Sequence, residues 1–136
     1  MSKENSVVIT SAVRTAIGDL GGSLKTVPAY KLGSTAILNA IKKSNLKPTD
    51  INEVIMGQVL TGGAGQNPAR QAAMDSGIPK ETPSYVVNQV CGSGLRSIAA
   101  GYQTIISNDA KIVVAGGQES MTNAPHTITF RNDKKS

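Results

Sequence analysis

The sequence predicts a layered α/β fold in one domain, with a largely parallel sheet of about four strands and three helices. Two observations predict this fold class. Short runs rich in β-branched residues alternate along the 136-residue chain with longer segments whose apolar residues recur at helical spacing. Each β-branched run is apolar rather than alternating, as expected for strands covered on both faces. The resulting order β-α-β-α-β-α-β favours parallel strands joined by right-handed crossovers.

The four predicted strands cover residues 7–13, 54–60, 85–90 and 112–115. Between the first two lies a predicted helix at 30–43, whose apolar residues form one stripe, as a helix that covers a sheet requires: Leu32, Ala36, Ile37, Ala40 and Ile41. After Gly117 the chain becomes polar and loses periodicity, so the encoded sheet ends at its fourth strand.

The second predicted helix has clear start and stop signals. Asn67 can cap its first turn, Pro68 suits the first helical position, and Gly77 ends it. The third helix begins directly after Cys91 and extends to about Ser107. Its apolar residues share one face: Leu95, Ile98, Ala99, Tyr102, Ile105 and Ile106.

Composition and charge narrow the functional classes. The net charge is +5, but the lysines and arginines are scattered without aromatic interleaving, so we expect no nucleic-acid partner. No window approaches the ~20 apolar residues of a membrane span, which argues against a membrane protein. One cysteine cannot form an internal disulfide, and the N-terminus carries neither an apolar signal region nor an Arg-rich presequence. We therefore expect a cytoplasmic protein.

Cys91 stands where a predicted strand meets a predicted helix, in the segment VNQVCGSGLRSI at 87–98. A lone cysteine is most often an inert buried side chain. A helix N-terminus, however, favours the thiolate form, and the carboxyl edge of a parallel sheet is where open α/β proteins bind ligands. Gly92 and Gly94 would let a substrate approach the backbone, and Arg96 is near while no acidic residue lies between Glu81 and Asp109. The local sequence leaves an inert and a reactive thiol both open.

Several segments resemble the thiolases, the acyl-CoA C-acyltransferases, in family order. VNQVCGSGLRSIAAGYQTI resembles the nucleophile segment of that family, and SAVRTAIGDLGGSLK resembles its opening strand and loop. VIMGQVLTGGAGQNPARQAAMDSGIP resembles the second strand and its helix, and VVAGGQESMTNAPH the strand and loop after the nucleophile helix. The resemblance covers residues 7–126, and we expect residues 1–126 to be a partial N-terminal domain of a thiolase-like fold. Residues 127–136 are expected to be a polar tail that does not match the family.

The resemblance implies a function for Cys91. The corresponding cysteine accepts an acyl group from an acyl-CoA thioester, and a second acyl-CoA, deprotonated at its α-carbon, then attacks by Claisen chemistry, or the reverse thiolysis occurs. The resemblance also implies that the backbone N–H of Cys91 and a glycine amide from elsewhere donate hydrogen bonds to the oxyanion of each tetrahedral intermediate. It implies coenzyme A thioesters as substrates, no permanently bound cofactor, no metal, and a homo-oligomer, dimeric or tetrameric in the full-length family.

Parts of the family pattern are missing. Thiolases also need a histidine and a second cysteine from the C-terminal half of a longer chain, and a loop domain that contributes most of the coenzyme A contacts. We therefore expect a truncated chain that is inactive alone. The alternatives are a non-catalytic fragment or dimerisation module of the same ancestry and, less favoured by the glycines of CGSGL, a ketoacyl synthase-type condensing enzyme.

Three further features have simpler interpretations. His126 does not match a catalytic segment and is interpreted as a loop residue. The TGGAG segment at 61–65 lacks the spacing of a phosphate-binding loop and is interpreted as a flexible loop. Glu119 could serve as a general base, but a single loop carboxylate is more often solvated or a structural hydrogen-bond acceptor.

Overall fold

The structure is a computed structural model that describes residues 6–128. Most of the predicted polar tail, residues 129–136, lies outside the described residues. Three helices and three strands form an α/β arrangement, together with two short 3-10 helices at Pro48–Asp50 and Met121–Asn123. The helices are α1 (Ala29–Lys43), α2 (Pro68–Asp75) and α3 (Ser93–Ile106), and the strands are β1 (Glu53–Gly57), β2 (Ser84–Val87) and β3 (Val113–Gly117).

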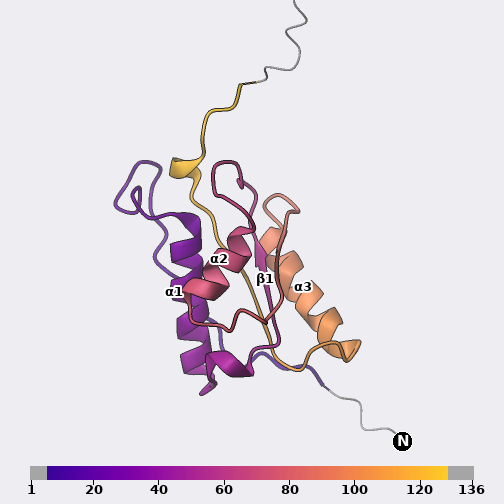
Figure 1. Cartoon of the computed structure of the whole chain (residues 1–136). Helices are drawn as coiled ribbons and strands as arrows, with labels where there is room; N and C mark the ends of the chain where they lie inside the picture. The colour runs from indigo at the N-terminus through magenta and orange to yellow at the C-terminus, as the bar shows by residue number, and fades with distance from the viewer. Residues whose placement is uncertain (1–5, 129–136) are drawn as a thin grey trace, which may run out of the picture.

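The sheet is parallel, with the strand order β2-β1-β3. The chain moves from β1 outward to β2 and then back past β1 to β3. Two right-handed crossovers in opposite directions place their helices on opposite faces of a sheet. Accordingly, α1 and α2 pack together on one side of β1 and α3 lies on the other (Figure 1).

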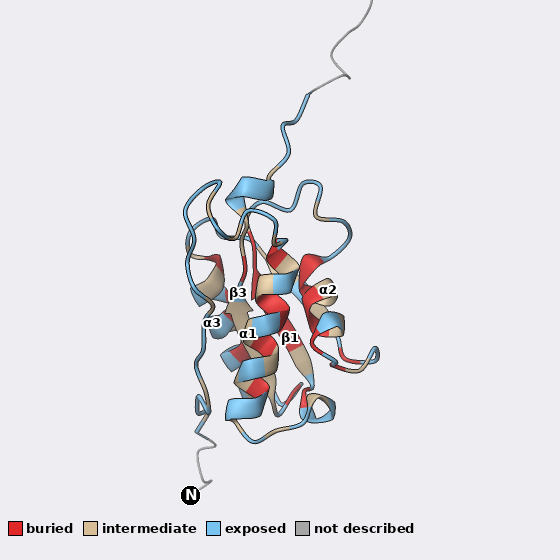
Figure 2. Ribbon diagram, turned by 90° about the vertical axis from the view of Figure 1, so that its left-hand side faces the viewer, coloured by how far each residue is buried: buried red, intermediate tan, exposed pale blue. Residues whose placement is uncertain are grey.

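The main core lies between the sheet and the helices α1 and α2. Alternation along β1 sends Val54 and Met56 to this side, where they join Ile37 of α1 and Ala72 of α2. The buried residues accordingly gather where α1, α2 and β1 meet (Figure 2). The core contains aliphatic residues, alanine and methionine, in agreement with the low aromatic content of 3%.

Local sequence signals explain the boundaries of α2. The Asn67 side chain accepts a hydrogen bond from the Arg70 N–H and Pro68 is the first residue, which confirms the predicted cap. Gly77, with φ of +84°, follows the last turn and permits the left-handed exit that the sequence predicted.

The first predicted strand is wrong. Residues 7–13 form no strand, and Val8 and Ile9 are 72% and 78% exposed. The hydroxyl groups of this segment bind the end of α1 instead, because the Ser11 Oγ donates to the Ala40 carbonyl at 2.9 Å and Thr10 pairs with Ser44 at 2.8 Å. An apolar run is therefore not sufficient to predict a paired strand.

Two other predicted strands end earlier than expected. The run at 54–60 ends as a strand at Gly57, and the run at 85–90 ends at Val87. Both remaining stretches continue as loops at the carboxyl edge of the sheet. After a last bond from the Gln58 N–H to the Val87 carbonyl of β2, backbone groups at Val59, Leu60 and Val90 bond to side chains. These loops build the candidate site.

Candidate active site

Cys91 lies in the turn between β2 and α3, at the carboxyl edge of the sheet. Its side chain is exposed and forms no disulfide. The strand order reverses at β1, since β2 lies on one side of it and β3 on the other. Open α/β sheets bind ligands at the carboxyl edge near such a reversal. The structure therefore places the predicted cysteine where this class of fold presents ligands.

The turn before Cys91 holds a strained residue. Val90 has φ of +50°, a left-handed conformation that a β-branched side chain rarely adopts. Three hydrogen bonds fix it: the Val90 N–H donates to the Asn88 side-chain oxygen at 3.0 Å, and the Val90 carbonyl accepts from the Ser93 N–H and Oγ. Such strain persists only where the surroundings enforce it, and it clusters at functional sites.

The backbone amides around Cys91 are mostly engaged within the turn. Gln89 donates to the Ser93 Oγ at 2.8 Å, and Gly92 donates to the Gln89 carbonyl at 3.1 Å. With Val90 and Ser93 also bonded, Cys91 is the one residue from 89 to 93 whose N–H makes no hydrogen bond within residues 6–128. An unengaged donor beside a thiol is suited to binding a developing oxyanion.

Close packing fixes the start of α3 against the sheet. A β-carbon added at Gly57 would lie 2.4 Å from the Ser93 carbonyl carbon, so only glycine allows the approach. The backbone of Gly94 also lies close to the end of β3, since a β-carbon at Gly117 would be in ordinary contact with the Gly94 α-carbon at 3.4 Å. The first turn of α3 is therefore in contact with the ends of β1 and β3.

The loop after β1 is bonded to both neighbouring loops. The Glu119 carboxylate accepts hydrogen bonds from the Val59 and Leu60 amides at 2.9 and 3.2 Å. The Asn88 side chain, which also accepts from Val90, donates to the Val59 carbonyl at 3.3 Å. Glu119 thus serves as a structural acceptor, the simpler of its two interpretations. Sequence reasoning missed Asn88, although a side chain that favours turns just before the cysteine was a usable signal.

Two glutamines join these loops beneath the surface. The buried Gln118 donates from Nε2 to the Gln58 Oε1 at 2.8 Å and to the Pro68 carbonyl at 3.1 Å. The Gln58 Nε2 in turn donates to the Leu60 carbonyl at 2.9 Å. Together these bonds connect the ends of β1 and β3 to the start of α2.

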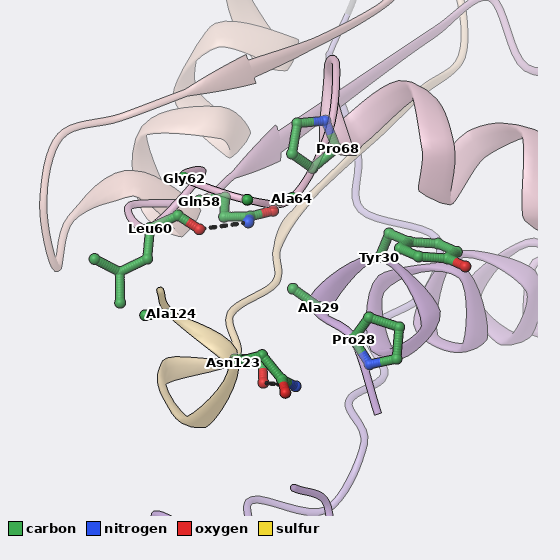
Figure 3. A pocket seen from close by; sticks show the side chains of 12 residues that line it. Pro28, Ala29, Tyr30, Gln58, Leu60, Gly62, Ala64, Pro68, Asn123 and Ala124 are labelled. Carbon is green, nitrogen blue, oxygen red and sulfur yellow. Dashed lines mark hydrogen bonds between the residues drawn. The ribbon is translucent and has the colours of Figure 1, made fainter. Parts of the chain in front are cut away.

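A cavity of about 150 Å³ lies beside these glutamines, between the start of α1, the loop at 58–68 and the residues around Asn123 (Figure 3). Gln58 and Leu60 line it, but Cys91 does not. A volume of this size is below the ~300 Å³ of typical ligand pockets, so it cannot enclose a coenzyme A thioester.

The two remaining sequence candidates, His126 and the TGGAG segment, lie in loops. His126 is exposed in the segment after the second 3-10 helix. TGGAG forms turns, with Gly62 and Gly63 at the rim of the small cavity and Gly63 close to Pro125. No helix within residues 6–128 is long and apolar enough to cross a membrane.

The fold and the site define a parallel α/β protein that presents an exposed cysteine on a strained strand-to-helix turn. Residues 7–135 match the family model described as the thiolase N-terminal domain. The chain therefore belongs to the thiolase family.

The sequence is also similar to those of curated acyltransferases. An acetyl-CoA acetyltransferase from Cupriavidus necator is 52% identical over 127 residues, which cover 93% of this chain and 32% of the relative. A probable acetyl-CoA acyltransferase from Staphylococcus aureus is 54% identical over 122 residues, covering 90% and 31%. An acetyl-CoA acetyltransferase from Rhizobium meliloti is 48% identical over 130 residues, covering 96% and 33%. The chain thus spans about a third of the length of these relatives.

Proposed function

We propose that Cys91 is the acyl-accepting nucleophile of an acyl-CoA C-acyltransferase. Its thiolate attacks the carbonyl carbon of an acyl-CoA thioester, a new carbon–sulfur bond forms, and coenzyme A leaves as a thiolate that takes up a proton. A second acyl-CoA, deprotonated at its α-carbon, attacks the acyl group and releases the Cys91 thiolate. A covalent intermediate divides one difficult condensation into two easier steps.

The observation that carries this proposal is the turn at 89–93. The turn exposes the sulfur at the start of α3, and the neighbouring Cys91 N–H has no other hydrogen bond in the described chain. The negative oxygen of each tetrahedral intermediate would accept from this N–H and from a glycine amide elsewhere in the complete protein. Removing one such donor typically costs ~10²-fold or more in rate.

The complete reaction requires groups beyond this chain. The relatives that share the family name are about three times as long, and the family resemblance assigns the histidine, the second cysteine and most coenzyme A contacts to the additional length. We infer that this chain alone carries out no more of the reaction than acyl transfer to Cys91. We also infer that it acts in the cytoplasm and as part of a homo-oligomer. Coenzyme A thioesters are its substrates rather than bound cofactors.

A non-catalytic interaction module is the second candidate. It is favoured by one observation: the cavity at the carboxyl edge is small and excludes Cys91, so residues 6–128 do not enclose an acyl-CoA beside the sulfur. A module of this kind would keep the fold of the family without turnover.

The experiment that separates the two candidates is intact-protein mass spectrometry after incubation with acetyl-CoA. The acyltransferase assignment predicts one acetyl group on the parent and none on Cys91→Ala. Cys91→Ser is a matched control, because it keeps the size of the side chain but replaces the thiol with a weaker nucleophile. Equal labelling of all three proteins would reject Cys91 as the nucleophile.

A further inference from the structure

The peptide group between Val90 and Cys91 has a fixed direction in the structure. The Val90 carbonyl points into the turn, where it accepts hydrogen bonds from the Ser93 N–H at 3.1 Å and from the Ser93 Oγ at 2.6 Å. This peptide is trans, because the described part of the chain contains no cis peptide bond. In a trans peptide the carbonyl and the N–H point in opposite directions. The Cys91 N–H therefore points out of the turn, away from Ser93.

This direction depends on the left-handed conformation of Val90. The φ angle of Val90, +50°, is the rotation between its own N–H and the peptide group that carries the Cys91 N–H. A return of Val90 to the extended region, which valine prefers, would turn the Cys91 N–H to another direction. Ser93 restrains the carbonyl side of Val90, and Asn88 restrains the other side, because its Oδ1 accepts from the Val90 N–H at 3.0 Å.

Asn88 uses both ends of its amide group. Its Oδ1 binds the N–H two residues further on, which is the contact of an Asx turn, and its Nδ2 donates to the Val59 carbonyl at 3.3 Å. Val59 lies in the loop after β1, and its N–H donates to the Glu119 carboxylate, in the segment after β3, at 2.9 Å. Asn88 thereby connects the Val90 N–H to the segments that follow the other two strands.

We propose that Asn88 is a positioning residue for acyl transfer to Cys91. It acts through the Val90 N–H and directs the Cys91 N–H toward the oxygen of the tetrahedral intermediate, a role that rests on the proposed function of Cys91. Asparagine suits this role because it combines an acceptor for the Val90 N–H with a donor for the Val59 carbonyl. Alanine offers neither group, and aspartate offers only the acceptor.

Two reactions of the same sulfur separate this role from a general effect on folding. Acetyl transfer from acetyl-CoA forms an oxyanion that the Cys91 N–H binds, whereas alkylation by iodoacetamide displaces iodide and forms no oxyanion. Both reactions use the thiolate, so the ratio of their rates cancels any change in the fraction of thiolate. We expect this ratio to fall by about 10- to 10²-fold in Asn88→Ala, since a misplacement of about 1 Å can cost the larger factor. Asn88 is exposed, so this variant loses hydrogen bonds rather than packing and should stay folded.

A conservative variant and a matched control complete the experiment. Asn88→Asp keeps the acceptor for the Val90 N–H, so its ratio of rates should lie closer to that of the parent than to that of Asn88→Ala. Asn52 is also exposed, and its Oδ1 accepts from the Lys111 and Ile112 N–H groups, each at 3.0 Å. These contacts lie just before β1 and β3, at the opposite edge of the sheet. Asn52→Ala should therefore lower the thermal unfolding temperature but leave the ratio of rates unchanged.

The outcomes distinguish failure of this role from failure of the proposed function. An Asn88→Ala ratio equal to that of the parent would overturn the positioning role and leave Cys91 as the nucleophile. So would an Asn88→Asp ratio as low as that of Asn88→Ala, or an equal fall in Asn52→Ala, which would reveal a general effect of lower stability. A parent that is alkylated at Cys91 but takes up no acetyl group there would overturn the proposed function, and the role of Asn88 with it.

Discussion

Gly57 at the end of β1 and Ser93 at the start of α3 are in direct backbone contact, so that a β-carbon at Gly57 would lie 2.4 Å from the Ser93 carbonyl carbon. The Ser93 Oγ in turn donates to the Val90 carbonyl in the turn that presents Cys91. The position of the thiol therefore depends on a residue more than thirty positions earlier in the sequence.

We expect Gly57→Ala to be destabilising, because the added methyl group meets backbone rather than a movable side chain. Overpacking of this kind typically costs about 1–3 kcal/mol in the free energy of unfolding. Gly116→Ala is the matched control, since its β-carbon would meet only Met56 at ordinary contact distances of 3.8 Å and more. Urea denaturation of both variants measures the difference. Equal stability of the two would contradict the close packing of α3 on β1.

Val90→Asn should relieve the strain in the cysteine turn. Asparagine tolerates the left-handed conformation better than a β-branched residue, and the exposed Val90 side chain contributes little burial. We expect thermal unfolding to show unchanged or higher stability, by up to about 1 kcal/mol. A variant that is less stable than the parent by that amount would show that the valine conformation is not strained.

Glu119→Gln should destabilise the chain by about 1–2 kcal/mol, because the Val59 and Leu60 N–H groups bind different carboxylate oxygens and the amide replaces one of these acceptors with an NH2 donor. Hydrogen exchange at Val59 and Leu60 should become faster. If the variant kept its stability and its slow exchange but lost acyl transfer, Glu119 would be a catalytic base instead of a structural acceptor.

The Lys31–Asp75 pair should make stability depend on pH at both extremes. The hydrogen bond from Lys31, with a second from Ser34, lowers the pKa of Asp75 from its ordinary value of 3.8. The contribution of Asp75 is therefore present above pH 3.8 and is lost as the pH falls through its lower folded pKa. The hydrogen bond to Asp75 raises the pKa of Lys31 above 10.5, so the contribution of Lys31 is complete below that pH and is lost above its folded pKa.

Denaturation curves between pH 2 and pH 12 measure this effect, which should be small because both side chains are partly exposed. In Asp75→Asn, the free energy of unfolding should fall less as the pH drops below 3.8 and should fall less at high pH. An unchanged pH profile in this variant would exclude the pair as the cause.

Local signals in the sequence predicted much of the fold. Asn67, Pro68 and Gly77 determine where α2 begins and ends through contacts within a few residues, and the structure has the helix boundaries that they predicted. Cys91 was placed at the strand-to-helix junction from a similarly local pattern, an apolar run followed by glycines and helical spacing. Residues 7–13 were assigned wrongly because a run of apolar residues does not specify which strand it pairs with.

The orientation of α3 and the conformation of Val90 depend on distant contacts. The apolar pattern of α3 was identified, but only the approach of Ser97 and Gly101 to β3 decides which face is covered. The β-branched side chain of Val90 disfavours a positive φ, so residue propensity predicts an extended conformation at this position. The positive φ is held instead by hydrogen bonds to Asn88 and Ser93.

Locating an acetyl group within the chain after incubation with acetyl-CoA tests directly whether Cys91 is the nucleophile. Trypsin should release residues 81–96, which contain Cys91 and no lysine, so that any acetylation of lysine appears in other peptides. If Cys91 is the nucleophile, the acetyl group is found on this peptide, is removed by neutral hydroxylamine as a thioester is, and is absent after Cys91→Ser. Acetyl groups found only on lysine-containing peptides, or resistant to hydroxylamine, would contradict the assignment of Cys91 as the nucleophile.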